Sequence, residues 1–188
     1  MKFCSSCGSA EITLTIPKGD NRPRFVCPLC QEIFYNNPKI VAGCIAAWQG
    51  KVLMCKRAIE PRCGKWTLPA GFMENQETTL EAAAREAQEE ATAQVENLSL
   101  YTMYNLPHIN QVYVMFRGDL VEGRASPGIE SLEVALLDEQ EMPWQELAFP
   151  VIKETLELYF QDIRSNHFTL HYGDMRRLPN MSYEIERY

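Results

Sequence analysis

The run that follows Thr78 and Thr79 constrains the fold more than any other part of the chain. It contains no Gly or Pro and is rich in Ala, Glu, Gln and Arg, the residues that lose least on entering a helix. At about 100° per residue, one narrow stripe collects Leu80, Ala84, Ala87 and Ala91, and the far side collects Glu86, Glu89 and Glu90. We therefore expect a helix that begins close to Glu77 or Thr79 and lies close against a sheet through its alanines.

The crowded carboxylates on this helix indicate a cation. Like charges three and four residues apart repel by a few tenths of a kcal/mol per pair. Hard Mg²⁺ or Mn²⁺ ligated by oxygen removes that cost. The alternative is a solvated acidic face on a surface helix, which is what a Glu-rich helix usually is.

The spacing around this helix carries a family resemblance. Counted out, Gly71 to Glu90 runs G-x5-E-x7-R-E-A-x-E-E, and the segment WTLPAG precedes it. This resembles the Nudix box of the Nudix hydrolases. The resemblance implies an α/β fold, the Nudix α/β/α sandwich with a mixed sheet, and hydrolysis of a diphosphate. It also implies that Glu86, Glu89 and Glu90 bind the metal.

Further roles follow from the same resemblance. Gly71 lets a backbone carbonyl approach the metal. Arg85 is expected to be a catalytic-site residue with a positioning role. Its guanidinium would pair with Glu77 or Glu86 and hold the helix against the preceding loop. Glu89 is a candidate general base. Outside the box, Glu130 and Glu133 are candidates for a further ligand or base, and the resemblance favours Glu133 because E-V-x-L-L looks like the family's strand after an acidic loop.

Two departures from the family pattern concern the end of the helix. Thr92 stands where the family has Gly, and Ala87 and Ala93 are small where bulky aliphatic residues are commoner. A left-handed residue costs a non-glycine side chain roughly 1 kcal/mol or more. We therefore expect this helix to end in a different shape, with the metal ligands unaffected.

Two cysteine pairs open the chain. Cys4-x2-Cys7 and Cys27-x2-Cys30 have the spacing of a four-cysteine zinc site, and they predict a zinc ribbon over residues 1–36. Two disulfides or a metal-free relic are the alternatives. So short a segment cannot bury a sufficient core, so a structural Zn²⁺ would supply folding energy. Cys44 and Cys55 are expected to be packing residues, and Cys63 is not expected to be a catalytic thiol.

The amino-acid composition limits which partners and substrates the chain is expected to bind. The net charge of −7 disfavours long RNA or DNA, which bind proteins with many Lys and Arg on one face, and favours a small dinucleotide. No signal peptide or membrane-spanning run is visible, so we expect a cytoplasmic protein without a membrane partner. Homodimers are common among similar enzymes. Arg57 belongs to the densest basic patch before the box and is a candidate phosphate contact.

The remaining chain predicts a sheet followed by a second helix. Strand-like runs lie at Lys39–Trp48, Lys51–Lys56, Leu98–Tyr104, Gln111–Leu120 and Leu132–Leu137. Gln49-Gly50 predicts a hairpin turn, and a helix is expected from Pro150 to about Arg164. In the fourth run one face is expected in the core and the other beside a cleft. The Nudix domain would then span residues 37–166, before a C-terminal tail at 167–188.

Substrate choice rests mostly on resemblance. From Cys4 to about Gly173 the chain resembles the FAD pyrophosphatases that also act on ADP-ribose, and it lacks the S-Q-P-W-type array of the NADH pyrophosphatases. We expect hydrolysis of FAD to FMN and AMP, and of ADP-ribose; NADH or another Nudix substrate is the alternative. Candidate stacking residues are Phe72, Tyr104 and Tyr113. A nucleotide-binding regulatory module without turnover is the non-enzyme alternative.

Overall fold

The computed structural model describes residues 1–188 and divides them into two compact units, Met1–Pro38 and Lys39–Tyr188. In the first unit, β1 (Thr13–Thr15), β2 (Arg24–Val26) and β3 (Ile33–Phe34) form an antiparallel sheet in that order. The only buried residues of this unit are Cys4 and Cys27. Its strands therefore bury no apolar core, as the sequence led us to expect.

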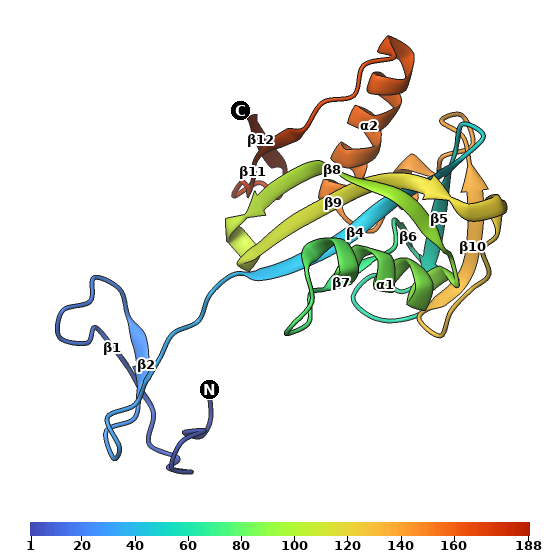
Figure 1. Ribbon diagram of the computed structural model, residues 1–188. Helices are drawn as coiled ribbons and strands as arrows, with labels where there is room; N and C mark the ends of the chain where they lie inside the picture. The colour runs from blue at the N-terminus through green and yellow to red at the C-terminus, as the bar shows by residue number, and fades with distance from the viewer. The chain divides into compact units, whose positions relative to one another are not determined.

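The second unit is built on one mixed sheet with strand order β10-β5-β4-β9-β8-β11-β12 (Figure 1), to which β6 adds beside β5 and β7 beside β4. β4 pairs in parallel with β9, and β8 with β11, whereas the other neighbours are antiparallel. The strands are β4 (Lys39–Trp48), β5 (Lys51–Arg57), β6 (Trp66–Thr67), β7 (Ala70–Phe72), β8 (Val95–Leu106), β9 (Gln111–Leu120), β10 (Ser131–Leu137), β11 (His171–Arg177) and β12 (Tyr183–Arg187).

Two helices cover opposite faces of this sheet. Side chains alternate along β4, so Val41 and Ile45 join the cluster under α2 (Pro150–Ser165), while Ala42, Cys44 and Ala46 join the cluster under α1 (Thr79–Ala91). Short 3-10 turns at Pro107–Ile109, Val121–Gly123 and Trp144–Glu146 complete the connections. The predicted α/β/α sandwich is confirmed. Neither helix is long and apolar enough to cross a membrane.

The hairpin turn at Gln49-Gly50 is confirmed. Ala47 and Trp48 of β4 pair with Val52 and Lys51 of β5, which leaves two residues in the loop. Gln49 and Gly50 both have positive φ, 49° and 79°. A two-residue loop of this conformation matches the twist of the two strands.

Two expectations about the sheet were wrong. The fourth predicted run, β9, is buried on both faces, because α2 covers Tyr113 and Met115 while α1 covers Val114 and Phe116. No side of this strand is left for a cleft. The segment 167–188, separated above as a tail, contains β11 and β12, and β11 extends the main sheet by parallel pairing with β8.

Candidate functional site

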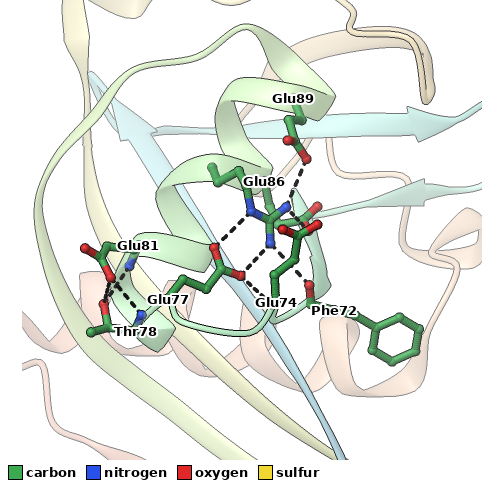
Figure 2. Close-up of polar contacts among 8 residues, drawn as sticks. Phe72, Glu74, Glu77, Thr78, Glu81, Glu86 and Glu89 are labelled. Atoms are coloured by element: carbon green, nitrogen blue, oxygen red, sulfur yellow. Dashed lines mark hydrogen bonds and ion pairs between the residues drawn. The ribbon is translucent and has the colours of Figure 1, made fainter.

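Helix α1 is anchored at its start by a capping box. The Thr78 hydroxyl accepts a hydrogen bond from the Glu81 N–H (3.2 Å), and the Glu81 carboxylate accepts one from the Thr78 N–H (2.7 Å; Figure 2). These reciprocal bonds satisfy two backbone donors that a helix start otherwise leaves without partners. The helix therefore begins at Thr79, one of the two starts that the sequence predicted.

The end of α1 corrects the expectation drawn from Thr92. This residue adopts the left-handed conformation (φ 47°, ψ 31°) that the family's glycine would take, so the helix ends in the usual shape. Its hydroxyl bonds to the carbonyl of Ser126 at 2.6 Å and lies 2.8 Å from the Ser126 hydroxyl. These contacts with the following loop offset the steric cost of the left-handed conformation in a non-glycine residue.

The predicted packing stripe of α1 is confirmed at Ala87 and Ala91 but wrong at Leu80. Leu80 is 44% exposed, whereas Glu86 and Glu90 are only 8% and 5% exposed. The alanines that pack against the sheet are Ala82, Ala83, Ala87 and Ala91. Two of the three box carboxylates thus lie on the packed side of the helix, and only Glu89 remains on the solvent side.

Strand β7 receives the two buried carboxylates. A Cβ on Gly71 would lie 2.3 Å from a Glu86 carboxylate oxygen, so only glycine leaves room for that side chain. The Glu90 carboxylate accepts a hydrogen bond from the Ala70 N–H at 3.3 Å. Gly71 therefore lets the helix carboxylates reach the backbone of β7, which adds a second reason for the glycine to the one predicted.

Arg85 links the box residues to one another, and its partners Phe72, Glu77, Glu86 and Glu89 are labelled in Figure 2. Its guanidinium binds both oxygens of Glu77 (3.0 and 2.8 Å), Glu86 (2.7 Å), Glu89 (2.9 Å) and the Phe72 carbonyl (3.2 Å). The predicted pairing of Arg85 with Glu77 or Glu86 is confirmed for both partners. The arginine holds the loop before α1 against the helix.

The carboxylates of Glu77, Glu86 and Glu90 fall into two groups, one with lowered and one with raised pKa. Hydrogen bonds from Arg85 and from the Glu74 N–H lower the pKa of Glu77 to about 2. Burial, helped by the charge of Glu86, raises the pKa of Glu90 to about 8, and burial also raises the pKa of Glu86. Two buried carboxyl groups that resist ionisation fit a hard divalent cation, since oxygen-bound Mg²⁺ or Mn²⁺ would stabilise their charged form.

The two candidate carboxylates outside the box, Glu130 and Glu133, have different surroundings. Glu130 is among the charges that raise the pKa of both Glu86 and Glu90. The Glu133 carboxylate instead lies 3.4 Å from the Lys56 ammonium, and its side chain is 55% exposed. The resemblance favoured Glu133, and the role of either residue stays a prediction.

The loop that carries Glu130 is fastened to the end of α1. The Gly128 N–H donates to the Glu90 carbonyl (3.0 Å), and the Ser126 N–H donates to the Ala91 carbonyl (2.8 Å). A Cβ on Gly128 would lie 1.7 Å from the Glu89 carbonyl oxygen. The sequence analysis missed this contact; the dipeptide Pro127-Gly128 shortly before Glu130 was the available signal.

The predicted substrate contacts divide into buried and accessible residues. Tyr104 is fully buried with its hydroxyl on Glu154 (2.9 Å), and Tyr113 is 7% exposed in the core under α2, so their prediction as stacking residues was wrong. Phe72 is 49% exposed and remains available. Arg57 binds the Pro61 carbonyl (2.8 Å), and its guanidinium lies over the Phe149 ring at 5.3 Å.

The four cysteines of the first unit converge as a metal site requires. Their sulfur atoms all lie within 4.8 Å of one another, and Cys4–Cys30 and Cys7–Cys27 are 3.6 Å apart. None of them forms a disulfide. Tetrahedral zinc with Zn–S bonds of ~2.3 Å places its sulfurs about 3.8 Å apart. The four thiols therefore fit a closed structural Zn²⁺ site.

Comparison with known families gives two matches along the chain. The family model described as "NUDIX domain" matches residues 37–159, and the one described as "Nudix N-terminal", a zinc ribbon, matches residues 2–36. A crystal structure of a NUDIX hydrolase from Nitrosomonas europaea is 54% identical, with a TM-score of 0.89, and the match covers 94% of this chain and 99% of that one.

Curated relatives match at lower identity. The NAD-capped RNA hydrolase NudC of Photobacterium profundum is 31% identical over 136 residues, which are 71% of this chain and 48% of that protein. The ADP-ribose pyrophosphatase of Methanocaldococcus jannaschii is 31% identical over 121 residues, 61% of this chain and 69% of that protein. The chain thus spans about half the length of the NudC proteins it matches.

Proposed function

The chain belongs to the Nudix family, and from this premise we propose that it is a metal-dependent hydrolase of the diphosphate linkage in nucleoside diphosphate derivatives. One observation carries the proposal: Glu86 and Glu90 are buried together beside Gly71 of β7, with Glu89 on the solvent side of the same helix. Burying two carboxyl groups side by side costs free energy unless a cation binds them. This arrangement therefore favours a cation-binding role for the two carboxyl groups over a purely structural one.

The residues of the chain take distinct roles in this proposal. Glu86, Glu89 and Glu90, with the Gly71 carbonyl, would hold Mg²⁺ or Mn²⁺. When bound, such an ion neutralises the diphosphate and lowers the pKa of a coordinated water. Glu89 is the candidate base, because it is exposed and held only by Arg85. Arg85 positions Glu86 and Glu89 and anchors the loop through Glu77.

A carboxylate from outside the box completes the candidate site. Glu130 is our preferred residue because its charge acts on both buried carboxyl groups. Glu133 is the second candidate, and it would first have to leave Lys56. Glu130→Gln and Glu133→Gln should therefore differ in kcat, with the larger loss at Glu130.

For the substrate we propose a nucleoside diphosphate derivative with an adenylate half, either ADP-ribose or FAD. The ADP-ribose pyrophosphatase relative supports the first, and the sequence resemblance described above supports the second. The NudC relatives are named for NAD-capped RNA, so a dinucleotide cap on RNA is a further candidate. The net charge of −7 favours a small substrate over a long RNA.

A substrate panel tests the proposal. The values of kcat/KM for FAD, ADP-ribose, NADH, nucleoside triphosphates and NAD-capped RNA should be measured side by side with Mg²⁺ and with Mn²⁺. We expect AMP as a product from FAD or ADP-ribose. A tenfold preference for NADH, capped RNA or a triphosphate, about 1.4 kcal/mol, would reject the substrate proposal and leave the hydrolase proposal standing.

The competing function is a nucleotide-binding regulatory module. It predicts binding of the same compounds without turnover at any metal concentration. Absence of product from every substrate in the panel, together with measurable binding, would establish that function instead.

A further inference from the structure

A groove of about 590 Å³ lies at the N-terminal end of α2. Three separate parts of the chain line it: the loop between β5 and β6 with Arg62 and Lys65, the approach to α2 with Trp144 and Phe149, and the β11–β12 hairpin with Arg177 and Tyr183. Its volume lies within the ~300–1,000 Å³ of small-molecule sites. We call it the α2 groove.

The α2 groove carries unpaired positive charge. Its two acidic residues are already paired, Glu154 with Arg187 (2.7 Å) and Glu157 with Lys153 (3.6 Å). Arg62, Lys65 and Arg177 form no ion pair. Three unpaired cations around one concavity, in a chain of net charge −7, provide a local site for an anion.

A neighbouring concavity shows that this charge is specific to the α2 groove. It measures about 520 Å³ and is also lined by Trp144 and Lys153. Its two cations are both neutralised, Lys153 by Glu157 and Arg164 by Glu139. The two concavities therefore have similar volumes, but only the α2 groove carries unpaired positive charge.

The α2 groove also offers aromatic surface, and the end of β5 joins it to the loop that carries Glu130. Trp144, Phe149 and Tyr183 lie in its wall, and each is at least partly accessible. Arg57 lies over the Phe149 ring (5.3 Å), and its backbone N–H donates to the Lys65 carbonyl (2.9 Å). The next residue, Ala58, donates its N–H to the Glu130 carbonyl (2.8 Å).

We propose that the α2 groove binds the nucleoside 5′-phosphate half of the substrate, with Arg62, Lys65 and Arg177 facing phosphate oxygens and the aromatic wall facing the base. Cationic side chains form strong charge-assisted bonds to phosphate, and aromatic rings stack on any base. The inference rests on the proposed function. Arg177 and Tyr183 lie beyond residue 159, where the match to the NUDIX domain ends, so the C-terminal hairpin makes this site particular to chains that carry it.

Calorimetric titration of the full zinc-containing chain with AMP, in buffer without Mg²⁺ or Mn²⁺, tests the groove independently of turnover. We expect AMP to bind wild type, and to bind Arg177→Gln and Arg62→Gln about tenfold more weakly. Arg176→Gln is the matched control, because Arg176 is the neighbouring residue of β11 and bonds to Asp174 (3.1 Å) outside the groove. Its affinity for AMP should stay within twofold of wild type. Adenosine, which lacks the phosphate, should bind wild type and Arg177→Gln alike.

Kinetics separate this proposal from the proposed function. With Mg²⁺, Arg177→Gln should raise KM for ADP-ribose about tenfold and leave kcat within twofold, the result expected when binding is lost equally in ground and transition states. No AMP binding by wild type, or equal effects of Arg177→Gln and Arg176→Gln, would overturn the groove assignment even if the enzyme is active. An inactive wild type that still binds AMP through Arg177 would instead overturn the proposed function alone.

Discussion

Three glutamates of one helical turn have different environments in this protein. Glu86 and Glu90 are buried against β7, and Glu89 is on the solvent side with Arg85 as its partner. All three are expected ligands, yet they should differ in what their loss does to the folded protein. A buried carboxyl group affects both stability and metal binding, whereas an exposed one affects chiefly the metal.

Replacing Glu89 or Glu90 by Gln should lower kcat by at least about 100-fold, because each change removes a negatively charged ligand and leaves the shape unchanged. Steady-state kinetics with saturating Mg²⁺ measures this. Glu81→Gln, on the same helix, is the control: it weakens the capping box by about 1 kcal/mol or less and should leave kcat unchanged. Activity within threefold of wild type for both box variants would contradict the metal assignment.

The pKa of Glu90 makes the stability of the metal-free protein depend on pH. The unfolded chain loses this proton near its ordinary value of 4.5, whereas the folded chain keeps it until about pH 8. Because the folded state binds more protons between these values, stability should fall as pH rises from about 4.5 to about 8. Glu90→Gln should remove that part of the slope.

Urea unfolding of wild type and Glu90→Gln in buffer without Mg²⁺ or Mn²⁺, across this pH range, measures the contribution of Glu90 together with its coupling to Glu86. Parallel pH profiles would show that Glu90 ionises normally. Added Mg²⁺ should stabilise wild type more at pH 8 than at pH 6, because the cation binds the charged form.

At the scale of elements, α1 depends on partners at both ends. The Thr78 capping box fixes its start, and the loop before β10 binds the carbonyls of Glu90 and Ala91 at its end. The second contact also sets the position of Glu130. A small change in this loop should therefore affect stability and turnover together.

Gly128→Ala tests that coupling. The added methyl group would lie 1.7 Å from the Glu89 carbonyl oxygen, so the loop must move away from the helix. We expect a loss of about 1–3 kcal/mol in the free energy of unfolding and a lower kcat. Gly19→Ala is a control for backbone strain without a steric contact, since Gly19 has positive φ (89°) and no atom lies within 4 Å of the added carbon; its kcat should not change. Unchanged kcat in folded Gly128→Ala would show that Glu130 needs no such support.

At the scale of the whole molecule, the two units depend on different sources of stability. Lys39–Tyr188 buries a core on each face of its sheet, whereas Met1–Pro38 buries only Cys4 and Cys27. A segment of this size without a core needs a metal or disulfides, and its four thiols are free and clustered.

Purified protein should therefore contain about one zinc per chain, measured by elemental analysis of protein prepared without chelator. Cys27→Ser should lose the metal and make Met1–Pro38 sensitive to proteolysis, while the kcat of the second unit stays near that of wild type. Cys63→Ser, at an exposed cysteine outside the cluster, is the control and should retain the zinc. Metal-free wild type with four equally reactive thiols in this unit would refute the zinc site.

The sequence alone predicted the features that depend on neighbours along the chain. The start of α1, the turn at Gln49-Gly50 and the two Cys-x2-Cys pairs follow from short-range geometry and spacing, and the pairing of Arg85 with Glu77 came from the family resemblance. Such contacts are settled within one or two turns of chain, so residue types at fixed offsets are sufficient to predict them.

Only the tertiary structure decided which residues far apart in the sequence come into contact. Helical periodicity does not show how far a helix is rotated on its sheet, and in the folded chain Glu86 lies beside Gly71 with both Glu86 and Glu90 buried. The loop that carries Glu130 meets the end of α1 through the backbone bonds of Ser126 and Gly128, which join residues far apart in the chain. Strand β11 pairs in parallel with β8. No short sequence pattern predicts this pairing, because contacts between residues far apart in the chain set both the partner strand and the register.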